Sequence, residues 1–256
     1  MQRTMNRRVK MLGVSAIVLG ALIAAAAVLA SVAAEDWAEP RVESLTVKQG
    51  GIEVTWSASG YTSGLVGSEI GRSLTGNAND WQTVAEVEAG TYTYLDEMDG
   101  VDLVNRDSGS VWHYRVRLTQ RGPTGAPTIG EWSNARSATV PSISPPVYPF
   151  ASKLNELGYM WLVWTEHNPS WSSDTLVVDG YAMLRSVHEP GTFPHTGVVS
   201  VIARVPPHHI NHPFQVEWPE QRRLRLTYKV VSFSGVWFSA TDTLPWFVVP
   251  NRLRPN

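Results

Sequence analysis

The sequence contains no cysteine, so no disulfide can stabilise its folded part, and no cysteine can serve as a nucleophile, a metal ligand or a site of lipid attachment. It also lacks a Gly-x-Ser-x-Gly turn, a glycine-rich phosphate loop and any spacing of Ser, His and Asp that assembles a triad. We therefore expect a protein that is not an enzyme and that uses no cofactor. Its stability must come from hydrophobic cores, for which 11 Trp, 8 Tyr and 6 Phe are available.

Charge is absent from residues 11–34, which are mostly aliphatic. Residues 1–10 form a basic flank on one side, and Glu35 and Asp36 begin an acidic region on the other. At 1.5 Å per residue, a helix over this stretch reaches about 36 Å, enough to cross a hydrocarbon core of about 30 Å. The flanks predict a cytoplasmic N-terminus and an exported C-terminal part. We favour a retained single-pass membrane anchor; the alternative is a signal segment that is cleaved after Ala34, which gives a secreted protein.

Basic residues do not predominate after this segment. None of the 23 acidic residues lies within residues 1–34, whereas four of the 21 Lys and Arg residues do. The exported part is therefore net acidic, which excludes a nucleic-acid partner because that role requires a basic surface. The partners we expect are the membrane, through residues 11–34, and a protein or a glycan outside the cytoplasm.

Long helical periodicity is missing after residue 34, and short alternating runs take its place. Residues 52–56 alternate so that Ile52, Val54 and Trp56 share one face, and residues 111–119 do the same. Clusters of Gly, Asn, Asp and Pro separate these runs, which predicts an antiparallel β-sandwich over residues 40–141. The core residues that the pattern predicts in this unit are Trp56, Trp112, Tyr114 and Val116.

A second unit repeats the pattern over residues 150–250. Residues 142–149 are rich in proline and predict a semi-rigid linker between the two units, and residues 251–256 form a short tail. The run around Trp164 parallels the run around Trp56, which indicates an internal repeat at the scale of a domain. The core residues expected in the second unit are Trp164, Tyr181, Tyr228 and Val230.

The motifs of the first unit resemble a fibronectin type III domain. The resemblance rests on the strand at residues 52–56, on Gly67-Ser68-Glu69-Ile70-Gly71-Arg72, on Tyr94-Leu95-Asp96, on Tyr114-Arg115-Val116 and on Trp132-Ser133. The second unit is similar in fainter form, through residues 179–185 and 226–232. The resemblance implies an all-β fold of two tandem immunoglobulin-like antiparallel sandwiches, preceded here by one hydrophobic helix. It also implies protein or glycan binding, adhesion, or a spacer role.

Two kinds of surface residue are candidates for binding. The aromatic residues Trp161, Trp171 and Trp237 belong to the unusually aromatic second unit, and Trp161 is expected on the outer face because it alternates with Trp164. They predict a protein-binding or carbohydrate-binding surface. His208, His209 and His212 lie in one short segment. If the segment is not simply a polar loop, these residues would ligate a metal ion, and the alternative function is a metal-binding or catalytic accessory domain. The acidic segment 96–102 is interpreted as a solvated turn.

Overall fold

The computed structural model describes residues 38–60, 62–122, 125–151, 159–165, 176–194, 197–209, 211–217, 224–240 and 246–249. The hydrophobic segment 11–34, its basic flank, Trp171 and the tail 251–256 lie outside the described residues. Within the described part, no helix has the length and apolar character needed to cross a membrane.

The first domain is a sandwich of two antiparallel sheets. One sheet has the order β1-β2-β5, and the other has the order β4-β3-β6-β7, with β8 also paired to β6. This division into a small and a larger sheet is that of a fibronectin type III-like domain. A three-residue 3-10 turn, η1, precedes β6. The bounds are β1 Glu39–Lys48, β2 Gly51–Ser59, β3 Leu65–Ser73, β4 Gln82–Glu88, β5 Thr93–Asp96, η1 Leu103–Asn105, β6 Val111–Arg121, β7 Pro127–Ile129 and β8 Arg136–Thr139.

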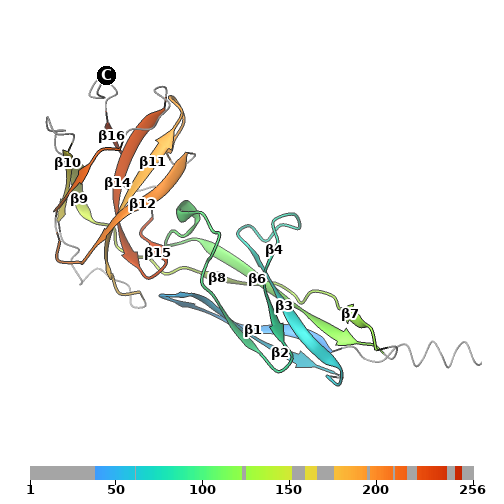
Figure 1. Cartoon of the computed structure of the whole chain (residues 1–256). Coiled ribbons are helices and arrows are strands. Elements are labelled where there is room, and N and C mark those ends of the chain that lie inside the picture. Colours follow the sequence, from blue (N-terminus) through green and yellow to red (C-terminus); the bar gives the residue numbers. More distant parts are fainter. Residues whose placement is uncertain are drawn as a thin grey trace, which may run out of the picture.

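The second domain repeats this arrangement. Its smaller sheet has the order β13-β10-β9, and its larger sheet has the order β12-β11-β14-β15, with β16 also paired to β14. All the pairs are antiparallel. Figure 1 shows the two sandwiches, with β15 at the place where they meet. The bounds are β9 Val147–Ala151, β10 Tyr159–Thr165, β11 Gly180–His188, β12 Val198–Val205, β13 Asn211–Gln215, β14 Arg225–Ser234, β15 Trp237–Phe238 and β16 Phe247–Val249.

Alternating apolar residues build both cores, as their sequence pattern predicts. Successive residues of β6 alternate between buried and partly exposed positions, because successive side chains of a strand point to opposite faces of the sheet. The predicted core is confirmed in both domains. Trp56, Trp112, Tyr114, Val116, Trp164, Tyr181, Tyr228 and Val230 are all buried.

The predicted linker is only partly a linker. Ile143 packs in the first core together with Val140, and β9 begins at Val147, inside the segment 142–149. The free connection is therefore shorter than the proline pattern indicated, because apolar residues between the prolines find a core to enter.

The larger sheet of the second domain is covered on both faces. In β14, the residues from Leu226 to Ser232 are all buried, instead of alternating. One face packs in the second core. On the other face, Val231 lies in a separate apolar cluster with Phe238, against which Leu103 of the first domain also packs. The covered outer face is thus part of the contact between the two domains.

Candidate functional site

The hairpin of β14 and β15 inserts into the first domain. The side chain of Trp237 is fully buried, and it belongs to the same core cluster as Trp56 and Ile52 of the first domain. Its Nε1 donates a hydrogen bond to the carbonyl oxygen of Lys48 at 2.7 Å, which satisfies the one polar atom of the indole. The backbone nitrogen of Val236 donates to the carbonyl oxygen of Gln49 at 2.9 Å. The hairpin therefore closes the end of the first sandwich.

Gly235 makes this close approach possible. Its φ is +58°, and a Cβ atom at this position would lie 1.9 Å from the carbonyl oxygen of Gln49. Asp179, just before β11, fixes the turn from the second domain, because its carboxylate accepts hydrogen bonds from the backbone nitrogen of Gly235 at 2.7 Å and from Nε2 of Gln49 at 3.3 Å. One carboxylate thus holds both sides of the junction.

Phe238 continues the contact with main-chain bonds. Its backbone nitrogen donates to the carbonyl oxygen of Arg106 at 3.0 Å, and its carbonyl oxygen accepts from the backbone nitrogen of Ser108 at 2.7 Å. Asp107 and Phe238 accordingly form a short parallel bridge. The loop after η1 therefore pairs with β15 as if it were an added strand, and this pairing leaves little freedom for the domains to rotate.

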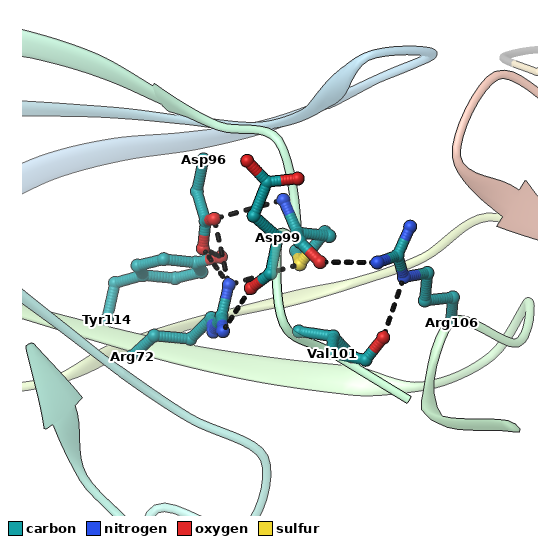
Figure 2. A network of polar contacts seen from close by, with 7 residues as sticks. Arg72, Asp96, Asp99, Val101, Arg106 and Tyr114 are labelled. Atoms are coloured by element: carbon teal, nitrogen blue, oxygen red, sulfur yellow. Dashed lines mark hydrogen bonds and ion pairs between the residues drawn. The ribbon is translucent and has the colours of Figure 1, made fainter. Parts of the chain in front are cut away.

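A buried ion pair supports the loop that carries this bridge. Nη1 of Arg72 donates to both carboxylate oxygens of Asp96, at 2.8 and 2.9 Å, and the hydroxyl of Tyr114 donates to Oδ2 of Asp96 at 2.7 Å (Figure 2). Arg106 donates from Nη2 to the carbonyl oxygen of Met98 at 2.6 Å and from Nε to that of Val101 at 3.2 Å. The network connects the first core to Arg106, whose carbonyl oxygen accepts the hydrogen bond from the backbone nitrogen of Phe238.

Burial shifts the pKa values of two members of this network, Tyr114 and Arg106. The pKa of Tyr114 is raised far above its ordinary value, first by burial and then by the neighbouring charge of Asp96. Burial likewise lowers the pKa of Arg106. The phenol of Tyr114 therefore stays protonated and serves as a hydrogen-bond donor to the carboxylate, which helps to satisfy Asp96 inside the domain.

A polar cleft of about 480 Å³ opens beside this network, lined by residues of β4 and β5. Arg72 and Asp96 contribute to its wall, but they bond to each other, and Asp96 also accepts from Tyr114 and from the backbone nitrogen of Met98. These hydrogen bonds occupy acceptor positions of the Asp96 carboxylate. In the wall of the cleft, Arg72 and Asp96 therefore serve as structural polar contacts.

A stack of alternating indole and guanidinium groups covers the outer face of the first domain's larger sheet. The guanidinium of Arg115 lies 4.2 Å from the ring centre of Trp81 and 4.4 Å from that of Trp132, and Arg117 lies 4.5 Å from that of Trp132. Gly71 provides the seat for Trp132, because a Cβ atom there would lie 3.2 Å from the indole. The alternation of Arg115 and Arg117 along β6 indicates that they share a face, whereas the two indoles come from other segments and have no such signal in the sequence.

The three tryptophans that were predicted to bind a partner lie in different environments or outside the described residues. Trp161 is 43% exposed on β10, and Tyr159 is 39% exposed two residues before it, so both lie on the same outer face. Trp171 lies outside the described residues. Trp237 is corrected: it is buried at the domain junction and is not a surface binding residue. The hairpin reverses the chain directly into the first core, a long-range contact that the local sequence pattern does not encode.

The three histidines do not form a metal centre. The rings of His208 and His209 lie 4.7 Å apart in the turn before β13, and His212 lies on β13 opposite Leu162. The pKa of His212 is lowered by burial and by the neighbouring His209. No group of three or more His, Asp or Glu residues that could hold a metal ion occurs in the part of the chain that the structure describes. The rings of His208 and His209 lie close together, but His212 on β13 does not complete a group of three ligands with them.

No family model and no curated protein matches the sequence. Among solved structures, pectate lyase PelI from Erwinia chrysanthemi in complex with tetragalacturonic acid is similar over 39% of this chain and 27% of its own, with 20% identity and a TM-score of 0.28. The FN1–FN3 domains of chicken CNTN1 are similar over 81% of this chain and 64% of theirs, with 12% identity and a TM-score of 0.32. The central fibronectin-III array of RIM-binding protein is similar over 82% of this chain and 63% of its own, with 13% identity and a TM-score of 0.29.

The chain therefore spans less than a third of the pectate lyase and slightly less than two thirds of each fibronectin array. We assign the fold from the sheet order and the cores of the two domains. The chain consists of two tandem fibronectin type III-like sandwiches, joined by a docked hairpin.

Proposed function

We propose that the protein is a non-enzymatic binding scaffold, held at a membrane by residues 11–34, that presents two docked sandwich domains outside the cytoplasm. The observation that carries this proposal is the burial of Trp237 of the second domain in the core of the first. A shared core fixes the angle between the domains, and a fixed angle allows surfaces on both domains to meet one partner without a further loss of conformational freedom. In this proposal, the domain contact replaces the proline-rich linker as the element that sets the geometry.

The test is photocrosslinking of the intact protein in its native membrane. A photoreactive amino acid at Ser137, on the outer face of the first domain, and another at Gln215, on β13, would each report on one domain. A scaffold predicts that the same partner is captured from both positions, and that Trp237→Ala reduces capture from at least one of them. Capture of no partner from either position would contradict the proposal. If both positions still capture the partner after Trp237→Ala frees the domains, the fixed angle between the domains is not required for binding.

Carbohydrate binding by the second domain is a second candidate. The exposed pair Tyr159 and Trp161 supports it, because aromatic rings on the outer face of a flat sheet are suited to stack on sugar rings. Trp161→Ala should then abolish retention of the protein on an insoluble polysaccharide, with no change in its unfolding midpoint. Equal retention of the variant and the parent protein would exclude this candidate.

A further inference from the structure

The stack on the first domain contains one arginine that is neutralised and one that is not. Arg117 donates from Nε and Nη2 to Oε2 of Glu69, at 3.0 and 2.6 Å. The side chain of Arg115 forms no ion pair and no hydrogen bond within the described ranges, and its Nε is buried without an acceptor there. The pKa of Arg115 is lowered by burial and by the nearby charge of Arg117. In the described part of the chain, no carboxylate is paired with the positive charge of Arg115.

The stack also holds Arg115 in a fixed position. Its guanidinium lies close to the rings of both Trp81 and Trp132, so two indoles contact it. A guanidinium edge presents its N–H donors in the geometry that suits a carboxylate. Because the side chain is already ordered, a partner that pairs with it avoids much of the usual entropy loss.

The surroundings of Arg115 match an extended chain. His113, Arg115 and Arg117 occupy alternate positions of β6, so they share one face at a spacing of about 7 Å, and Arg121 follows on the same face beyond Thr119. An extended peptide repeats its own side chains at the same spacing. Tryptophan and arginine are also the residues that most often dominate the binding energy of protein interfaces.

We propose that the stack of Trp81, Arg115, Trp132 and Arg117 is a docking surface for an extended acidic segment of a partner protein, with a carboxylate of that segment bound at Arg115. This deepens the proposed function and rests on it, because it names one of the surfaces that the scaffold presents. Glu69 shows that a carboxylate pairs with an arginine of this stack, through Nε and Nη2 of Arg117. At Arg115, where Nε is buried, the partner carboxylate pairs with the terminal Nη groups instead. Bulk polyanions lack the alternating spacing and are the alternative that the test must exclude.

The test measures binding of a fluorescent peptide with five Glu-Thr repeats to the full-length protein in mild detergent, by fluorescence anisotropy. We expect saturable binding that weakens as salt is raised, and at least tenfold weaker binding by Arg115→Gln. Arg41→Gln is the matched control, because Arg41 is an exposed arginine on β1, in the other sheet; its binding should equal that of the parent. A peptide of Lys-Thr repeats should bind only to Arg115→Glu.

Arg115→Lys is a second variant that separates a loss of peptide binding from a loss of folding. It keeps the charge but loses the flat stacking surface and the paired donors, so it should bind the acidic peptide several-fold more weakly while it keeps the unfolding midpoint of the parent. Peptide binding that is unchanged in Arg115→Gln and Arg115→Lys would overturn the proposal, and so would tighter, Arg115-dependent binding of dextran sulfate than of the peptide. If no peptide binds but the membrane crosslinking still captures a partner, this inference fails and the scaffold function stands.

Discussion

Trp237 of the second domain donates its indole N–H to the main-chain carbonyl of Lys48 in the first domain, at 2.7 Å. The two residues are 189 positions apart in the sequence. It places the largest side chain of the β15 hairpin where a fibronectin type III-like sandwich would otherwise end in a turn. The first domain therefore completes its core with a residue of the second, which makes the folding of the two domains interdependent.

Replacement of Trp237 by alanine should destabilise the first domain. The change removes a fully buried indole and leaves a cavity in the core, at a cost of about 3–5 kcal/mol. Denaturant unfolding followed by fluorescence measures the loss. Trp161→Ala is the control of equal chemistry, because Trp161 is 43% exposed, and it should change the stability by less than about 1 kcal/mol. Similar losses in the two variants would show that Trp237 is not part of a core.

The ion pair between Arg72 and Asp96 should be far more sensitive than a surface pair. Asp96→Asn leaves the charge of Arg72 buried without a counter-charge, and the expected loss of stability is about 3–5 kcal/mol. Glu53→Gln breaks the exposed pair with Lys48 and should cost no more than about 1 kcal/mol. Thermal unfolding of the two variants against the parent gives the comparison. A small effect of Asp96→Asn would mean that water reaches Arg72.

Gly71 and Gly122 should respond to alanine with opposite signs. In Gly71→Ala the new methyl group would lie 3.2 Å from Trp132, so the indole must shift, and we expect a loss of about 1 kcal/mol or more together with altered tryptophan fluorescence. Around Gly122, nothing lies within 4 Å of an added Cβ atom, and Gly122→Ala should be neutral or gain about 0.5 kcal/mol. A stabilising Gly71→Ala would show that the stack is loosely packed.

Tyr228 should make the stability fall in alkali. Burial raises the pKa of Tyr228 to about 12, so the folded protein holds this proton while the unfolded chain releases it near pH 10. The stabilisation is complete below about pH 10 and is lost as the pH rises towards 12, in the same direction as the contribution of Tyr114. Denaturant unfolding across this range measures it, and Tyr228→Phe should flatten part of the slope. An unchanged slope in this variant would contradict the assignment.

The sequence predicts those parts of this structure that repeat along a strand. The alternation of Trp112, Tyr114 and Val116 identifies a core face, because a strand needs only local information to sort its side chains. Trp164 and Tyr181 follow in the same way in the second domain. The fold class and the core are therefore readable from the chain.

The junction is not readable in this way. Trp237 looks like any exposed aromatic near a turn, and its burial depends on Lys48 and Gln49, which come from the opposite end of the folded region. The stack around Arg115 likewise joins Trp81, Arg115 and Trp132 from three separate segments. Such contacts depend on how the sheets pack onto each other, and no periodic pattern in a single sequence predicts them.

The most direct test of the docked domains is a distance measurement by pulsed electron spin resonance. Because the chain has no cysteine, cysteines introduced at Glu88 on β4 and at Gln215 on β13 would be the only labelling sites. A fixed junction predicts one narrow distance distribution for the parent protein, and a broad one after Trp237→Ala. A broad distribution in the parent protein, unchanged by Trp237→Ala, would contradict the account.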